Sequence, residues 1–139
     1  MVNPEIINER LRAMEENIIL LEELRSVPFD KFRKDPKTFK LALYALQICI
    51  QSLLDICHHI IVENNLPKPS TNQETIKTIS ENNIIPAEFA NTLLPVVGLR
   101  NILVHEYIKV GLDKIYKHLQ ELDDFRTFQK HIVKFLQKA

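Results

Sequence analysis

Apolar residues recur with helical spacing along most of the chain. Asn3 and Pro4 form a typical helix start, because asparagine caps a helix and proline suits its first position. The apolar residues that follow alternate steps of four and three, which predicts an amphipathic helix ending near Ser26. From 38 to 64 the chain has no proline or glycine and is apolar around most of the helical circumference. That pattern predicts a second helix at the centre of the fold or at an interface.

Prolines and capping residues divide the next part of the chain. The segment 66–70 contains two prolines between polar residues, which predicts a loop. Ser70 or Thr71 is a suitable cap for a predicted short helix that reaches about Glu81. Pro86 then opens the next predicted helix, since proline is favoured in the first helical turn.

Two helix-disrupting residues lie inside that helix. Pro95 and Gly98 predict a kink in it rather than its end. After Gly111, apolar residues on one stripe predict a last long helix. The chain shows no alternating strand pattern of useful length. We therefore expect an all-α fold, a four-helix bundle with one additional short helix, in a single domain over residues 1–139.

Composition excludes several function classes. Only two of the 139 residues are glycine, where average usage gives roughly ten. Glycine-rich phosphate loops, dinucleotide-binding folds and hairpin-rich sheets all need more glycine than this. Lys+Arg and Asp+Glu are 18 each, so no global field attracts nucleic acid or membrane, although a local basic cleft stays possible.

We expect a cytoplasmic protein without disulfides. No segment of the sequence is expected to span a membrane, and residues 1–12 lack the core of a signal peptide. Cys49 and Cys57 are eight residues apart in one predicted helix, which places their Cα atoms about 12 Å apart. A disulfide needs a separation under about 7 Å, so both are predicted to be buried thiols.

A line of polar residues runs along the otherwise apolar second helix. The line consists of Gln47, Gln51, Asp55 and His59, which follow one another at intervals of four residues. They form either the solvent edge of the helix or a polar groove, because glutamines and histidines are less typical of a solvent face than lysine and glutamate. Asp55 and His59 can form a hydrogen-bonded pair or supply two metal ligands. The sequence offers no obvious third ligand, and no metal site is predicted. His58 flanks the line.

A second group of chemically active residues spans 100–107. Arg100 and Tyr107 are seven residues apart and share a helix face, whereas His105 is rotated from Arg100 by about 140°. Arg100 and His105 can therefore meet at one ligand only if the helix deforms or a symmetric copy of the chain completes the site. A purely structural interpretation pairs Arg100 with Glu106 or Asp55 and lets His105 cap a helix C-terminus.

The pattern of arginine, four residues, histidine, one residue and tyrosine resembles the motif of the HEPN superfamily. More closely, the chain resembles a HepT-type toxin. The stretches QICIQSLLDICHHII, IIPAEFA and GLRNILVHEY occur in the order of that family. One departure is visible, because the family often has asparagine where this chain has His58.

The resemblance implies an all-α homodimer that cleaves RNA without a metal or another cofactor. Arg100 and His105 then lie in a cleft at the dimer interface, where the guanidinium binds phosphate and the imidazole acts as general acid or base. The implied partner is a nucleotidyltransferase antitoxin of the MntA type, in a type VII-like toxin–antitoxin system, which silences the toxin by adding AMP to Tyr107. The polar line with Gln51 and Asp55 is a candidate lining of the cleft.

Two other functions fit the same residues. The chain can be a non-catalytic HEPN adaptor that binds nucleotide or a nucleotidyltransferase, or a structural helical dimer whose motif residues form a buried polar cluster. The complete motif favours the enzyme, because a binding-only relative need not keep both Arg100 and His105.

Overall fold

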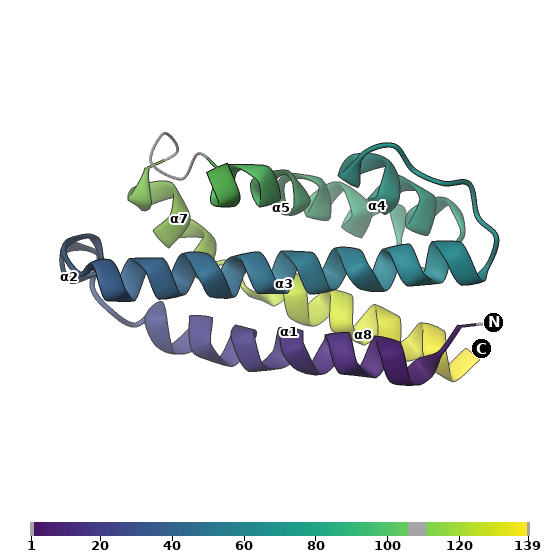
Figure 1. Ribbon diagram of the computed structural model, residues 1–139, viewed down its shortest axis with the longest axis horizontal. Helices are drawn as coiled ribbons and strands as arrows, with labels where there is room; N and C mark the ends of the chain where they lie inside the picture. The colour runs from purple at the N-terminus through teal and green to yellow at the C-terminus, as the bar shows by residue number, and fades with distance from the viewer. Residues whose placement is uncertain (1, 106–110, 139) are drawn as a thin grey trace.

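The computed structural model describes residues 2–105 and 111–138, with the side chains of 104 and 105 excepted. The described residues are all-α and contain seven helices (Figure 1). In chain order these are α1 (Pro4–Leu24), α2 (Phe29–Lys34), α3 (Pro36–Glu63), α4 (Asn72–Glu81), α5 (Ala87–His105), α7 (Leu112–Leu119) and α8 (Asp123–Lys138).

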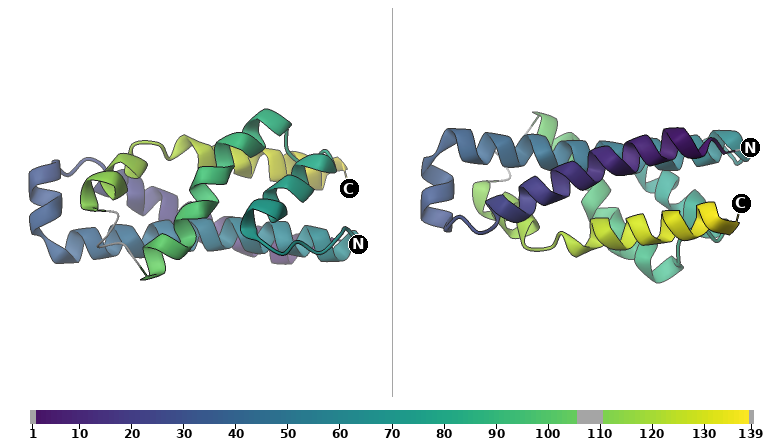
Figure 2. Two further views of the ribbon diagram at one scale, coloured as in Figure 1. Left: turned by 90° about the horizontal axis from the view of Figure 1, so that it is seen from above. Right: turned by 90° about the horizontal axis from the view of Figure 1, so that it is seen from below.

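The central element is α3, as its apolar circumference predicts. It lies antiparallel to α1, and α5 crosses it obliquely on one side while α8 runs beside α1 on the other (Figures 1 and 2). It also contacts α2 and α4. Most of its apolar side chains are buried, so α3 is the central helix of the hydrophobic core.

By length and composition, α3 is also the one described helix that could cross a membrane. No uncharged run of eighteen residues occurs in α3, because Asp55 interrupts it, so the expectation that no segment spans a membrane is not contradicted. The apolar stretch concerned is 61% buried inside the fold, as in the core helix of a soluble protein. A helix surrounded by five neighbours needs apolar residues on nearly every face, and so does a membrane helix.

The helix starts follow local capping chemistry. The Asn3 side chain accepts a hydrogen bond from the backbone N–H of Glu5 at 3.0 Å, which confirms the predicted start of α1. The hydroxyl of Thr71 accepts from the N–H of Glu74 at 3.1 Å, so Thr71 rather than Ser70 caps α4. Asp35 caps α3 in the same way.

The expected last long helix is in fact two helices. The backbone N–H of Gln120 bonds to the carbonyl of Lys117 at 3.0 Å, a tight turn that ends α7 before α8 begins at Asp123. Leu119, Leu122 and Phe125 are all buried and follow one another in steps of three, so the apolar spacing continues across the break and conceals it. Both helices contact α1, but α7 also contacts α2, whereas α8 also contacts α3.

One helix has no counterpart among the predicted elements. The six residues of α2 lie between two prolines and are too few to show a helical period. Phe32 in α2 is fully buried, and the rings of Phe29 and Phe32 lie 5.3 and 5.1 Å from the ring of Tyr116. The Tyr116 hydroxyl also donates to the carbonyl of Val27 at 2.6 Å, which joins α7 to the segment after α1.

The cysteines are as expected. Cys49 and Cys57 are both free and buried in α3. Burial raises the pKa of the Cys49 thiol to about 12 and raises the pKa of Cys57 still further. Both thiols are therefore protonated, unreactive parts of the core at neutral pH.

Candidate functional site

Arg100 reaches from α5 onto the middle of α3. The helix continues through Pro95 and Gly98 without ending, as predicted, and so carries Arg100 across α3. The half-buried guanidinium donates from Nε to Oε1 of Gln51 at 3.1 Å. Its Nη1 also donates to Oδ1 of Asn101 at 3.4 Å. Both acceptors are neutral amides.

The contact with Gln51 continues along α3 and reaches α1. Nε2 of Gln51 donates to Oδ1 of Asp55 at 2.8 Å, and Oδ2 of Asp55 lies 3.5 Å from Nε of Arg10. Gln51 thus lies between Asp55 and Arg100, so the carboxylate meets the guanidinium of Arg10 instead. These four residues, Arg10, Asp55, Gln51 and Arg100, form a polar chain across α1, α3 and α5, which we call the cleft network.

The rest of the predicted polar line makes other contacts. Nε2 of His59 accepts from the backbone N–H of Asn3 at 3.1 Å, and the described contacts of Asp55 do not include His59. The possible Asp55–His59 pair is therefore not among the described contacts, and the start of α1 bonds to the imidazole instead. Gln47 lies one turn before Gln51 on α3 and is half-buried. His58 faces α4, where its Nε2 lies 3.2 Å from the hydroxyl of Thr75.

The motif that begins at Arg100 extends beyond the described residues. His105 is the last residue of α5, and its side chain lies outside the described parts; Glu106 and Tyr107 lie outside the described residues altogether. The backbone of α5 is α-helical from Arg100 to His105. Within one chain, these two positions are therefore separated by about 140° around the helix axis.

The sequence analysis missed Arg10. This residue lies 45 positions before Asp55, on the exposed side of α1, where arginine is ordinarily a solvated residue. The one available signal is its place beside the apolar stripe of α1, between Ile7 and Leu11. In the described part of the chain, no group of three or more His, Cys, Asp or Glu residues is arranged to hold a metal ion.

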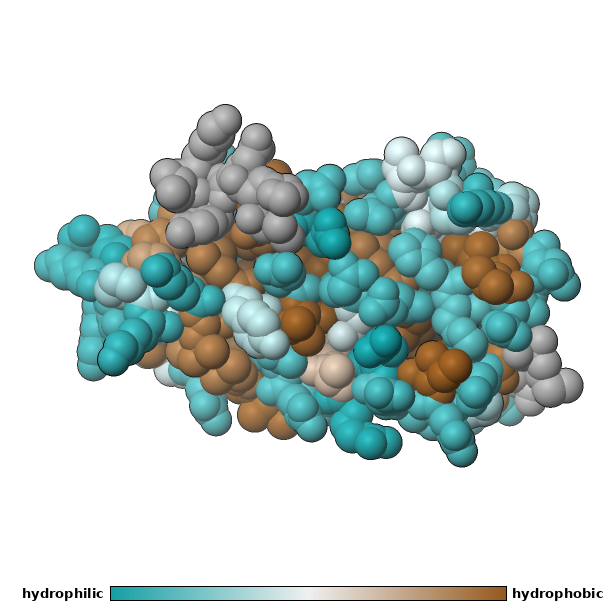
Figure 3. All heavy atoms as spheres, in the orientation of Figure 1, coloured by the Kyte–Doolittle hydropathy of each residue, from teal (hydrophilic) through white to brown (hydrophobic). Residues whose placement is uncertain are grey.

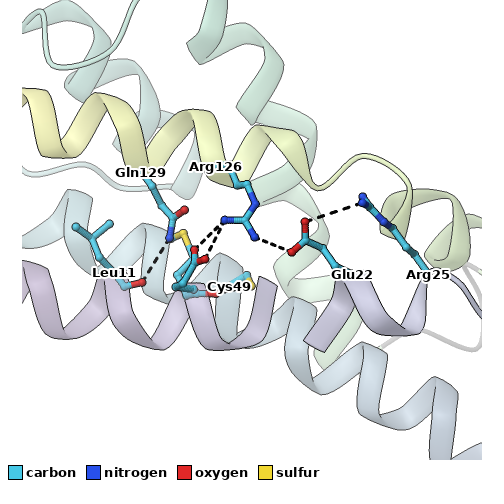
Figure 4. A network of polar contacts seen from close by, with 8 residues as sticks. Leu11, Glu22, Arg25, Cys49, Arg126 and Gln129 are labelled. Carbon is cyan, nitrogen blue, oxygen red and sulfur yellow. Dashed lines mark hydrogen bonds and ion pairs between the residues drawn. The ribbon is translucent and has the colours of Figure 1, made fainter. Parts of the chain in front are cut away.

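A second arginine network lies between α8 and α1. Figure 4 shows Arg126 reaching from α8 to carboxylates on α1. Its Nη1 donates to both oxygens of Glu15 at 2.9 and 3.0 Å, and its Nη2 donates to Glu22 at 2.6 Å. We call this group the α8 clamp. The hydrogen bond from Arg126 lowers the pKa of Glu15, and the bonds to Glu22 and Glu15 raise the pKa of Arg126.

An all-α fold, together with an Arg-x4-His-x-Tyr sequence motif that begins on its crossing helix, is that of a HEPN-domain protein. Residues 14–132 match the family model described as ribonuclease HepT-like. The chain belongs to this family of HepT-like ribonucleases, which confirms the resemblance found in the sequence.

Relatives and a solved structure agree with this assignment. The chain is 31% identical to the mRNA nuclease HepT of Shewanella oneidensis, over 70% of this chain and 74% of the relative. It is 25% identical to the tRNA nuclease HepT of Aphanizomenon flos-aquae, over 97% of this chain and 92% of that protein. Its fold matches the tri-AMPylated HEPN toxin of Shewanella oneidensis, solved in complex with an MNT antitoxin, with a TM-score of 0.84 and 27% identity. That match covers 93% of this chain and 97% of the toxin.

Proposed function

We propose that this chain is the ribonuclease toxin of a type VII-like toxin–antitoxin pair, and that it cleaves RNA without a metal at a site built from Arg100 and His105. The observation that carries the proposal is that the partners of Arg100 among the described residues are neutral. The described partners of this half-buried guanidinium are amide oxygens of Gln51 and Asn101. Its positive charge is therefore available to a phosphate, which a guanidinium can bind through two N–H groups at once.

The residue types support a cleavage reaction that uses the ribose itself. The 2′-oxygen forms a bond to phosphorus while the bond from phosphorus to the 5′-oxygen breaks. The imidazole of His105 takes the proton of the 2′-hydroxyl, and a second imidazole gives a proton to the departing 5′-oxygen. Arg100 stabilises the negative charge that builds on the phosphate oxygens.

A homodimer supplies the second imidazole in this proposal. The helical separation of Arg100 and His105 argues for a composite site, because one straight helix cannot direct both side chains at one phosphate. The surface supports a partner copy as well. Tyr44 is 60% exposed and lies two turns before Gln51 on the same side of α3. Apolar side chains reach the surface between hydrophilic ones over α1 and α3 (Figure 3).

The proposed partner is an MntA-like nucleotidyltransferase antitoxin. The solved relative is AMPylated and bound to an MNT antitoxin. In this chain, Tyr107 is the tyrosine of the motif and lies two residues after His105. AMP attached there would bring a phosphate to the guanidinium of Arg100 and so compete with RNA. A toxin that acts on cellular RNA also fits the predicted cytoplasmic location.

RNA cleavage in the presence of EDTA tests the enzymatic proposal. We expect the purified chain to cleave mRNA or tRNA with EDTA present, and Arg100→Ala and His105→Ala each to slow cleavage about a hundredfold or more. Arg33→Ala serves as a matched control, since Arg33 pairs with Asp30 on the distant α2. Unchanged cleavage in both site variants would overturn the assignment. Nucleotide or antitoxin binding without any cleavage by the wild type would instead identify a HEPN adaptor.

Mass spectrometry of the chain co-expressed with its antitoxin tests the modification. We expect a mass increase of one or more AMP units, located on the peptide that contains Tyr107, and no increase on that peptide in Tyr107→Phe. An unmodified Tyr107 in a chain that the antitoxin has silenced would contradict covalent silencing.

A further inference from the structure

Gln51 has two different polar neighbours on its two amide atoms. Its oxygen accepts from Nε of Arg100 at 3.1 Å, and its nitrogen donates to Asp55 at 2.8 Å. A carboxylate can only accept hydrogen bonds, and an arginine can only donate them. One orientation of the amide satisfies both neighbours, and the reverse orientation satisfies neither. Asp55 therefore decides which end of Gln51 faces Arg100.

We propose that Gln51 and Asp55 are positioning residues that orient Arg100 for phosphate binding, with Arg10 holding Asp55 in place. This inference rests on the proposed role of Arg100 in RNA cleavage. The bond at Nε fixes the plane of the guanidinium. It leaves the two terminal nitrogens for a phosphate to contact. Nη1 makes only a long hydrogen bond to Asn101, at 3.4 Å.

The neutrality of Gln51 is part of the device. A glutamate at this position would also accept from Arg100, but it would cancel the positive charge that attracts phosphate. Asp55 carries a negative charge nearby, and Arg10 lies 3.5 Å from it on the side away from Gln51. The cleft network thus balances its own carboxylate and leaves one positive charge in excess, at Arg100.

Two substitutions of Gln51 separate the orientation of Arg100 from its charge. Gln51→Met keeps the length of the side chain without its amide, and we expect kcat/KM to fall about tenfold, the size of a lost hydrogen bond to a charged group. Gln51→Glu cancels the charge as well, so kcat/KM falls about a hundredfold and the logarithmic salt slope of RNA binding becomes shallower by about 0.7 per site. Gln51→Met keeps the wild-type salt slope, because Arg100 stays charged.

A double-mutant cycle tests whether Asp55 acts through Gln51. We expect Asp55→Ala to lower kcat/KM about fivefold in the wild type and to have no further effect in Gln51→Met. Asp55→Asn restores most of the loss, since its amide oxygen can still accept from Gln51. Arg10→Ala lowers kcat/KM about twofold, because an exposed ion pair contributes little.

Nuclear magnetic resonance gives a readout that does not depend on cleavage. The Nε–H signal of Arg100, assigned by its loss in Arg100→Lys, is expected to exchange with water several times more slowly than that of the exposed Arg12. Gln51→Met removes this protection. A wild-type Arg100 signal that exchanges as fast as that of Arg12 would overturn the proposal.

The outcomes distinguish this inference from the proposed function. If Arg100→Ala and His105→Ala cleave like the wild type, the enzymatic assignment itself fails. If those two variants are inactive while Gln51→Met and Asp55→Ala cleave normally, only the positioning role is wrong. Effects of Gln51→Met and Asp55→Ala that multiply in the double variant would also contradict it, because they would show two independent actions.

Discussion

Two arginines of this chain have similar settings and different partners. Arg100 on α5 and Arg126 on α8 are both half-buried, and both reach across to an earlier helix. Arg126 meets two carboxylates, Glu15 and Glu22, at 2.9 and 2.6 Å, so its charge is paired. Arg100 meets the neutral amide of Gln51. The charge of the partner therefore separates an arginine that holds helices together from one that can bind an anion.

Exchanging each arginine for lysine gives the largest expected contrast. Lysine keeps the charge but loses the planar fork and the Nε–H that contacts Gln51. We expect Arg100→Lys to lower kcat/KM about a hundredfold while the thermal midpoint moves by less than about 2 °C. Arg126→Lys should keep nearly full cleavage. Equal losses of cleavage in the two variants would erase the distinction between the cleft network and the α8 clamp.

Loss of the α8 clamp is expected to affect stability instead of chemistry. Arg126→Met removes the cation that Glu15 and Glu22 share, and Glu22 keeps only the contact with Arg25 at 3.9 Å. We expect the free energy of unfolding in urea at pH 7 to fall by about 1 kcal/mol, since partial exposure screens the charges. Cleavage per folded molecule should stay at the wild-type level. If Arg126→Met unfolds like the wild type but cleaves RNA more slowly, the two networks have the opposite roles.

The pH dependence of that loss follows from the pKa of Glu15. The hydrogen bond from Arg126 lowers this pKa below 4.5, the ordinary value of a glutamate side chain, so the clamp stabilises the folded state fully above that value. The stabilisation disappears as the pH falls through the lowered pKa, where the folded protein also takes up the proton. We expect the difference between wild type and Arg126→Met to be full at pH 7 and clearly smaller at about pH 3. A constant difference between these pH values would show that Arg126 stabilises by packing alone.

An exposed pair gives the smallest expected effect and a baseline for both networks. Arg33 contacts Asp30 at 3.2 Å, with side chains 47% and 83% exposed. We expect Arg33→Ala to change the free energy of unfolding by less than about 0.5 kcal/mol and to leave kcat/KM unchanged. A larger effect on cleavage would point to RNA binding at α2, in addition to the site at Arg100.

The local parts of the fold could be predicted because their causes are local. The stripe of α1, the apolar circumference of α3 and the cap at Thr71 depend on residues within one or two turns of one another. The motif around Arg100 is equally local, and its resemblance to the HepT-like family is confirmed. The catalytic roles of Arg100 and His105 and the modification of Tyr107 stay predictions.

The parts that were predicted wrongly depend on distant packing. The stripe after Gly111 gives no sign of the turn at Gln120, because Leu119, Leu122 and Phe125 keep a helical spacing across it while α7 packs on α2 and α8 packs on α3. A spacing of four also allows a pair of Asp55 and His59. It is not formed because Asn3, more than 50 residues away, donates to the imidazole.

The sequence by itself determined an all-α chain, the starts of its main helices and its membership of a ribonuclease family. Periodicity, capping and a short motif are properties of neighbouring residues and need no knowledge of the fold. Only the tertiary structure decided which arginine has neutral partners. Arg100 is 49 residues from Gln51, and Arg10 is 45 residues from Asp55. The crossing of α1, α3 and α5 brings these side chains within hydrogen-bond distance or ion-pair range, and the packing of the buried apolar faces sets that crossing.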